Sequence, residues 1–308
     1  MDRRLCILGT LVLSASAVLA QDTGPPSVIA IAREEIKPGR MASHTRSAAS
    51  FVAAATKANA PLHRIALVPI SGDGNAVAYL QTFGSFAEVE AARKQFDETV
   101  AANAAFKTEL DRLDREEVDQ HASQRTAYYT LRADLSYHPR GMEQTARSRF
   151  MSVSTTRIKP GRIQDYVDYI KALNAARDKI GSQAHTAVYQ VASGATNGTF
   201  LTFTSMRSLS EMDDARQRME QSQKALDEAL GGADVVKQRR MLISDIVADG
   251  YNTVYAMEPT LSRPTEQFAA ADPDFWNPKP AAAAKALASK KQTPKAKESP
   301  KAKEAPKP

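Results

Sequence analysis

Histidine is the residue type in this chain best suited to chemistry at neutral pH. Two of the five histidines are separated by the same interval as a repeated motif. His63 and His185 are 122 residues apart, the interval at which a longer motif also returns. No histidine, cysteine or suitably spaced carboxylate accompanies either one in the sequence, so we predict no metal site there. Each is interpreted as a strand-end histidine that forms a hydrogen bond, with ligand binding as the alternative.

His44 lies in the first of two similar helical segments, and that segment is the less bulky one. Ala48, for example, stands where the second segment has Ile170. Smaller side chains either let a helix approach its sheet closely or leave a cavity beneath it. A cavity near His44 and Tyr79 is therefore our ligand-site hypothesis, and close packing through alanine is the alternative.

Two pairs of basic residues flank a Pro-Gly dipeptide just before each of these helical segments. They are Lys37 with Arg40 and Lys159 with Arg162. Basic residues beside the free N–H groups of a helix start are suited to anion binding. The favoured interpretation is structural, because the repetition in both places suits a tight strand-to-helix turn with solvated charges.

These motifs belong to an internal repeat that spans most of the chain. Ile-Lys-Pro-Gly-Arg occurs at 36–40 and again at 158–162, and the pattern that follows each copy is the same in kind. A period of 122 residues indicates a duplicated domain, since solenoid repeats are several times shorter. Each copy has the pattern of a βαββαβ unit.

Alternating and continuous apolar runs predict the strands, and apolar residues at helical spacing predict the helices. In the first copy we expect strands at 28–36, 62–71, 76–83 and 126–137, a helix at 41–57 and one long helix from 86 to 113. In the second copy we expect strands at 150–158, 184–193, 199–204 and 244–257, with helices at 163–180 and 209–230.

A four-stranded antiparallel sheet with both helices on one face leaves its other face bare, which soluble proteins avoid. The run Val28-Ile29-Ala30-Ile31-Ala32 is apolar without alternation, as expected for a strand covered on both faces. The simplest solution packs the sheets of the two copies on each other. The duplication therefore predicts a pseudo-dimer within one chain.

The Ile-Lys-Pro-Gly-Arg joint that leads into an amphipathic helix, inside a βαββαβ unit of this size, resembles the dimeric α+β barrel superfamily of ferredoxin-like domains. That superfamily includes antibiotic-biosynthesis-monooxygenase-like and NIPSNAP-like proteins. The resemblance covers about residues 28–259. It implies an α+β fold of two ferredoxin-like βαββαβ repeats, 27–139 and 148–259, packed sheet to sheet as an intrachain pseudo-dimeric α+β barrel.

The resemblance also implies that small apolar or aromatic substrates, and haem in some branches, bind between helices and sheet. Haem would require a helix-borne histidine such as His44. The single tryptophan, Trp276, lies outside the repeats, so a tryptophan-dependent site does not carry over. The cofactor is left unknown: we expect none and keep haem as the alternative.

Residues 1–20 have the three parts of a cleaved signal peptide: Arg3 and Arg4, an apolar run, and a small-residue cleavage site at Ala20. This predicts a periplasmic or secreted protein. Cys6, the only cysteine, would leave with the signal, so no disulfide or thiolate chemistry is expected. No later segment is apolar enough to predict a transmembrane span.

Residues 260–308 lack periodicity and predict a disordered tail rich in Lys, Ala and Pro. Of the net charge of +6, residues 279–308 contribute nine lysines against two glutamates. This segment is suited to an anionic surface or to a role as a solvated spacer. It has no aromatic residue for base stacking, so nucleic acid is not expected as a specific partner.

The sequence lacks the glycine-rich nucleotide motifs and the common hydrolase motifs. Three functions remain. The first is binding of a small apolar ligand or service as an interaction module. The second is a monooxygenase-like enzyme, cofactor-free or haem-dependent, with one active half. The third is a scaffold attached to an anionic surface by its cationic tail. Whether chains associate further is left open.

Overall fold

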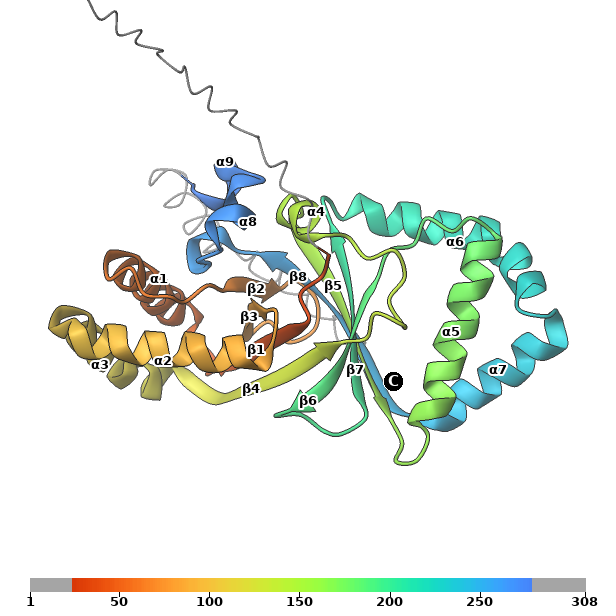
Figure 1. Ribbon diagram of the computed structural model, residues 1–308, viewed down its shortest axis with the longest axis horizontal. Coiled ribbons are helices and arrows are strands. Elements are labelled where there is room, and N and C mark those ends of the chain that lie inside the picture. The colour runs from red at the N-terminus through yellow and green to blue at the C-terminus, as the bar shows by residue number, and fades with distance from the viewer. Residues whose placement is uncertain (1–23, 279–308) are drawn as a thin grey trace, which may run out of the picture.

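The computed structural model describes residues 24–278, so the predicted signal peptide and the cationic segment 279–308 lie outside the described residues. Two βαββαβ halves follow one another (Figure 1). The first half consists of β1 (Val28–Ile36), α1 (Met41–Lys57), β2 (Ile65–Pro69), β3 (Ala76–Phe83), α2 (Phe86–Ala102), α3 (Ala104–Gln120) and β4 (His121–Leu131). After α4 (Met142–Ala146), the second consists of β5 (Phe150–Ile158), α5 (Ile163–Lys179), β6 (Ala187–Ser193), β7 (Thr199–Met206), α6 (Ser210–Ala229), α7 (Ala233–Ile246) and β8 (Val247–Met257).

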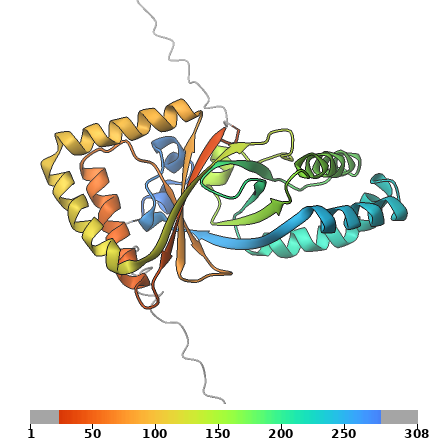
Figure 2. The ribbon, with the colours of Figure 1, turned by 90° about the horizontal axis from the view of Figure 1, so that it is seen from below.

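The strands of both halves form one closed barrel in the order β1-β3-β2-β8-β5-β7-β6-β4. All the neighbouring strands are antiparallel, and two pairings, β2 with β8 and β4 with β6, join the halves. Figure 2 shows the barrel in the middle, with α1 to α3 on one side and α5 to α7 on the other. The predicted α+β fold is confirmed, and the two sheets meet edge to edge as well as face to face.

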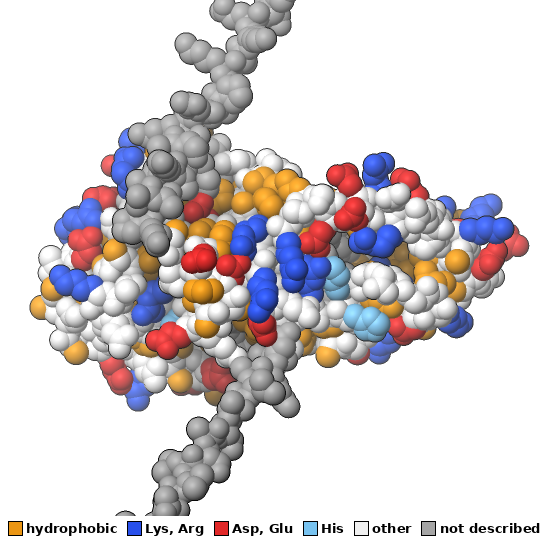
Figure 3. Space-filling view, turned by 90° about the horizontal axis from the view of Figure 1, so that it is seen from above, with side chains coloured by type: hydrophobic (Ala, Val, Ile, Leu, Met, Phe, Trp, Pro, Cys, Tyr) orange, Lys and Arg blue, Asp and Glu red, His pale blue; other side chains and the backbone are white. Residues whose placement is uncertain are grey.

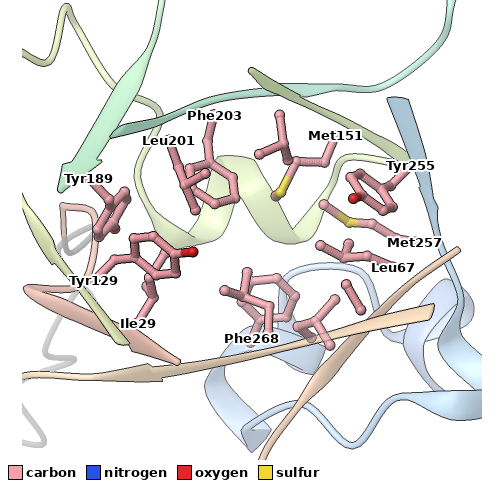
Figure 4. Packing of buried hydrophobic residues seen from close by; sticks show 14 of the residues in the cluster. Ile29, Leu67, Tyr129, Met151, Tyr189, Leu201, Phe203, Tyr255, Met257 and Phe268 are labelled. Atoms are coloured by element: carbon pink, nitrogen blue, oxygen red, sulfur yellow. The ribbon is translucent and has the colours of Figure 1, made fainter. Parts of the chain in front are cut away.

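Strand alternation divides the buried residues into a barrel interior and two helix-facing layers. On β1, Ile29 packs in the barrel interior, whereas Ala32 packs against the helix layer. The interior cluster draws its side chains from both halves and from the C-terminal helix that contains Phe268 (Figure 4). Burial of this shared cluster favours closure of the barrel over two separate halves.

The Pro-Gly turns have the structural role that the sequence predicts. Gly39 and Gly161 both adopt a φ of +79°, which glycine reaches without a steric penalty. The helices that follow begin at Met41 and Ile163. In each half the strand before the turn ends in a bulge at the matching position, so the joint is the same in both copies.

Two expectations about the helices are wrong. The single long helix expected from 86 to 113 is two helices, because Asn103 leaves helical geometry and its side-chain oxygen caps α3 by accepting from the Phe106 N–H. In the second half a further helix, α7, follows Gly231 and Gly232, both at positive φ. The last strand of the first half also begins five residues earlier than expected, at His121 instead of residue 126.

The expectation that disorder starts at residue 260 is wrong for residues 260–278. This segment contains a 3-10 turn (Pro259–Leu261), α8 (Glu266–Ala270) and α9 (Pro273–Trp276). Phe268 and Trp276 pack into the barrel cluster, and the indole N–H of Trp276 donates to the Ala146 carbonyl at 2.7 Å. Leu261, Phe268 and Trp276 are buried, and the apolar surface that they remove from water favours folding of this segment.

No helix within residues 24–278 combines the length and the apolar character that crossing a lipid bilayer requires.

Gly194 lies beside the seam where β4 and β6 join the halves, and we expect its replacement to be costly. Its φ is +82°, and a Cβ there would lie 2.2 Å from the Thr126 carbonyl oxygen. Gly194→Ala should lower the free energy of unfolding by ~2–5 kcal/mol, through backbone strain and overpacking. Gly181→Ala is the matched control, with φ of +62° but open space, and should cost about 1 kcal/mol. Urea unfolding measures both, and equal losses would contradict the clash.

Phe268→Ala tests the role of the C-terminal helices. Phe268 is buried and packs edge-on against Trp276 with ring centroids 5.1 Å apart. We expect a loss of ~3–5 kcal/mol in unfolding free energy and a red shift of Trp276 fluorescence as water reaches the indole. Phe86→Ala removes a half-exposed ring and should change stability by ~0.5 kcal/mol or less. An unchanged tryptophan spectrum would show that α8 does not pack on the barrel.

Candidate functional site

The helix-facing layer of the first half contains a cluster of buried polar side chains. Glu34 comes from β1, His44 from α1, Tyr79 from β3 and His121 from the start of β4. Strand alternation turns Glu34 away from the barrel interior, on the same side as Ala32. Glu34 is 6% exposed and His44 is 3% exposed. Side chains of this type are rarely buried so deeply without partners.

The distances within this cluster are short. His44 Nδ1 lies 3.2 Å from His121 Nε2, and His44 Nε2 lies 3.3 Å from the Tyr79 hydroxyl. Glu34 Oε2 lies 3.6 Å from His44 Nε2 and 3.5 Å from His121 Nε2. One potential ligand atom from each of Glu34, His44 and His121 lies within 4.8 Å of the others. We call these three residues the His–His–Glu cluster.

Burial sets the charge of the cluster. It raises the pKa of Glu34 to about 7, against the opposing effect of the Arg64 guanidinium. It lowers the pKa of His44 to about 4, and His121 and Arg64 add to that effect. Burial also lowers the pKa of His121, with Lys37 contributing. Both imidazoles are therefore neutral at pH 7, so the contact between His44 and Glu34 is not an ion pair there.

Arg64 lies against this cluster, and sequence reasoning missed it. Its guanidinium carbon is 3.9 Å from the centre of the Tyr79 ring and 4.5 Å from that of Phe51, as in cation–π contacts. Burial lowers its pKa. Three side-chain atoms among the described residues are buried without a hydrogen-bond partner: Arg64 Nε, Gln120 Oε1, next to His121 in the chain, and Arg239 Nε of α7 in the second half. Such atoms are uncommon in native proteins and mark a polar region that the protein alone does not fully satisfy.

The equivalent place in the second half is built differently. Thr156, Tyr166 and Val247 occupy the positions of Glu34, His44 and His121. Tyr166 contacts Phe200 with ring centroids 4.7 Å apart, and both belong to an apolar cluster beneath α5. The fold therefore does not require the polar set found in the first half.

The second candidate region is a cavity of about 90 Å³ at the end of the barrel where β2 and β6 begin. Its walls are mostly apolar and come from both halves: Ile29, Ile65, Leu80, Met151, Tyr189, Phe203 and Met257 among others. Phe268 of α8 and Met142 of α4 also line it. Figure 4 shows such side chains converging around an open centre. The face carrying α4 and α8 shows apolar surface beside gathered Lys and Arg side chains (Figure 3).

The structure brings the two repeated histidines to the rim of this cavity. His63 and His185 both line it, at equivalent places in the two halves. His63 Nδ1 lies 3.2 Å from the Pro264 carbonyl oxygen, and His185 Nε2 lies 3.4 Å from that of Ser205. Each thus contacts a backbone carbonyl rather than the other histidine. His44 and Tyr79 lie in the separate polar layer, in contact with each other.

The side chains of Lys37, Lys159 and Arg162 in the two Pro-Gly turns contact other protein groups. The Lys37 ammonium donates to the Val118 carbonyl at 3.0 Å. Arg162 pairs with Asp165 and Asp245, and Lys159 Nζ lies 3.9 Å from Asp245. The backbone N–H of Arg40 donates to the Lys37 carbonyl within the turn. An anion at the second turn would have to compete with two carboxylates.

Glu34, His121 and Arg64 could not be singled out from the sequence, because their neighbours along the chain give no ligand spacing. The one available signal was indirect: Glu34 breaks the apolar run of β1 on the side where Ala30 and Ala32 face the helix. His121 fell outside the expected strand, so it had no predicted face.

Haem does not fit at His44. Both of its ring nitrogens face protein side chains, Nδ1 toward His121 and Nε2 toward Tyr79, at 3.2 and 3.3 Å. The residue is also nearly fully buried beneath α1. An axial ligand needs one nitrogen directed into a space large enough for the porphyrin, and the barrel-end cavity is too small for that group.

No family model and no curated protein matches the sequence. Solved structures that resemble the chain include a monooxygenase-like protein of Fusobacterium nucleatum subsp. nucleatum, with 10% identity over 76% of this chain and 93% of that one and a TM-score of 0.44. An anthrone oxidase-like protein has 10% identity over 76% and 92%, with a TM-score of 0.43. A mutant chlorite dismutase from Candidatus Nitrospira defluvii has 11% identity over 79% and 95%, with a TM-score of 0.41.

Because these TM-scores are below 0.5, the matches carry no argument, and the strand order of the chain itself decides the fold. Each half runs β4-β1-β3-β2 or its equivalent, which is the ferredoxin-like order, and the halves close into one barrel. The chain therefore has the fold of the dimeric α+β barrel superfamily, with both ferredoxin-like halves in a single polypeptide.

Proposed function

We propose that this protein binds a small, uncharged, largely apolar molecule in the barrel-end cavity. The observation that carries the proposal is the composition of the cavity: apolar side chains from both halves and from α8 surround it, and a few polar side chains stand at its rim. This combination is typical of small-molecule sites, where apolar walls give affinity and few polar groups fix orientation.

The size of the cavity limits the ligand. At about 90 Å³ it is smaller than the ~150 Å³ cavities that enclose benzene completely. A single aromatic ring or a short branched chain would fill it and leave its polar end at the rim. The ligand we propose is therefore of the size of phenol or a simple ketone.

The rim favours an uncharged molecule. Arg140 is neutralised by Glu211, at 2.9 Å, and donates also to the Ser205 carbonyl. Burial, followed by the charge of Arg140, lowers the pKa of His185, which keeps this imidazole neutral at pH 7. The guanidinium of Arg64 is stacked on Tyr79 in the helix-facing layer. The rim thus supplies hydrogen bonds rather than net charge.

We further propose, from the signal-like residues 1–20, that binding takes place in the periplasm or outside the cell. Those residues lie outside the described part of the chain. This location would give the protein access to small molecules that cross the cell boundary.

Filling the cavity tests the proposal directly. Phenol, toluene and benzoate serve as probes, with binding followed by ligand-observed NMR on the full chain. We expect phenol to bind more tightly than benzoate, because burying a carboxylate without a counter-charge is unfavourable. Ala187→Phe places a ring in the cavity and should weaken phenol binding at least tenfold, because it displaces the probe.

Ala53→Phe is the matched control, since it adds the same ring on the exposed face of α1. It should leave phenol binding unchanged. Equal phenol binding by the wild type and Ala187→Phe, with both folded, would refute the site. An oxygenated probe recovered after incubation in air would instead support the monooxygenase-like alternative.

His185→Phe tests the polar rim. This variant keeps a planar ring but removes the imidazole nitrogens, so the preference for phenol over toluene should fall by roughly three- to tenfold, the equivalent of one hydrogen bond. His138→Phe alters a histidine that is exposed and does not line this cavity, and it should keep the preference. Competition NMR with both probes measures the ratio. A preference that survives His185→Phe would place the polar contact elsewhere.

A further inference from the structure

We propose that Glu34, His44 and His121 form a binding site for a divalent transition-metal ion. These residues come from β1, α1 and β4, and they converge beneath α1 in the helix-facing layer of the first half. The site is separate from the barrel-end cavity, whose lining contains none of the three. The proposal is therefore independent of the proposed function.

The spacing of the donor atoms matches a metal site. Two ligands bound tetrahedrally at 2.0–2.1 Å lie about 3.3–3.4 Å apart. His44 Nδ1 and His121 Nε2 are separated by 3.2 Å, and His121 Nε2 and Glu34 Oε2 by 3.5 Å. Two of the three distances between donor atoms are thus near the edge length of a tetrahedron, and one ligand atom from each residue lies within 4.8 Å of the others. Small side-chain movements would bring the three donors onto one ion.

The remaining ring nitrogen of His44 has a partner of the kind that metal-bound histidines use. If Nδ1 of His44 binds the ion, its Nε2 contacts the Tyr79 hydroxyl at 3.3 Å. Such outer contacts fix the orientation and tautomer of imidazoles in metal sites. If Nε2 of His121 binds, its Nδ1 is directed toward Glu117 Oε2, which at 4.0 Å is beyond hydrogen-bond distance.

The donor set selects the class of metal. Two imidazoles and one carboxylate suit zinc, iron(II), cobalt(II) or copper(II), whereas calcium and magnesium prefer oxygen ligands alone. Three protein ligands leave a fourth position for water or another small molecule, as in catalytic rather than structural zinc sites.

A bound cation would also compensate for the burial of the Glu34 carboxylate, which is only 6% exposed. Glu117 Oε2, 4.0 Å from His121 Nδ1, places a second carboxylate beside the site.

The second half shows that the fold can form without Glu34, His44 and His121. Thr156, Tyr166 and Val247 occupy the same places there, and the surrounding layer is apolar. Burying two imidazoles and a carboxylate is unfavourable unless something compensates for it. A bound cation is the compensation that we infer for the first half.

The test uses the full, untagged chain after removal of metal with EDTA. Zinc is titrated by calorimetry, and cobalt(II) is titrated by visible absorption, which reports ligand field and coordination number. We expect one ion per chain, cobalt bands typical of four- or five-coordination, and a higher Tm with zinc, because a ligand that binds only the folded state stabilises it. No binding of either metal at micromolar concentration would overturn the proposal.

The second half supplies variants expected to fold. His44→Tyr, His121→Val and Glu34→Thr each install the residue found at the equivalent position, and each should weaken zinc binding at least 100-fold. Tyr79→Phe removes only an outer contact and should weaken it by roughly 10- to 100-fold. His63→Gln and His185→Gln are controls and should bind zinc as the wild type does.

Circular dichroism confirms that each variant is folded. Zinc binding by folded His44→Tyr equal to that of the wild type would overturn the site. Phenol binding in the barrel-end cavity should be unaffected by His44→Tyr, so failure of the metal site and failure of the proposed function give different results.

Discussion

The closure of two antiparallel half-sheets into one barrel is the constraint on which the rest of this structure depends. Each half has helices on one face only, so an isolated half would expose its inner face and the edges formed by β2 and β4 or their equivalents. The pairings of β2 with β8 and of β4 with β6 satisfy those edges, and the shared interior covers both inner faces. The two halves are complete in topology yet depend on each other for stability.

Closure also creates two kinds of interior with different consequences. The barrel interior is shared by both halves, and its apolar lining together with α8 forms the cavity at one end. The two helix-facing layers each belong to one half, and they differ in composition. One is apolar around Phe200, and the other contains the His–His–Glu cluster together with Tyr79 and Arg64.

Comparison of the two layers shows that the fold itself does not require ionisable residues beneath its helices. An apolar layer suffices to hold α5 on its sheet. The polar layer of the first half instead places ionisable groups where burial shifts their pKa values, with His44 lowered to about 4 and Glu34 raised to about 7. Close packing through small residues such as Ala48 and Ala66 lets α1 lie near enough to the sheet for these contacts.

Local periodicity and backbone preference were enough to predict two βαββαβ halves, the bounds of β1, α1 and β3, and the turns at Gly39 and Gly161. The sequence also placed His44 and Tyr79 in one region. The contacts of His121 depend on the tertiary structure. His121 is 77 positions from His44 and 87 positions from Glu34 in the chain, and it meets them through strand pairing and a bulge that no local pattern specifies. Likewise, only barrel closure turned the equivalent His63 and His185 toward one cavity.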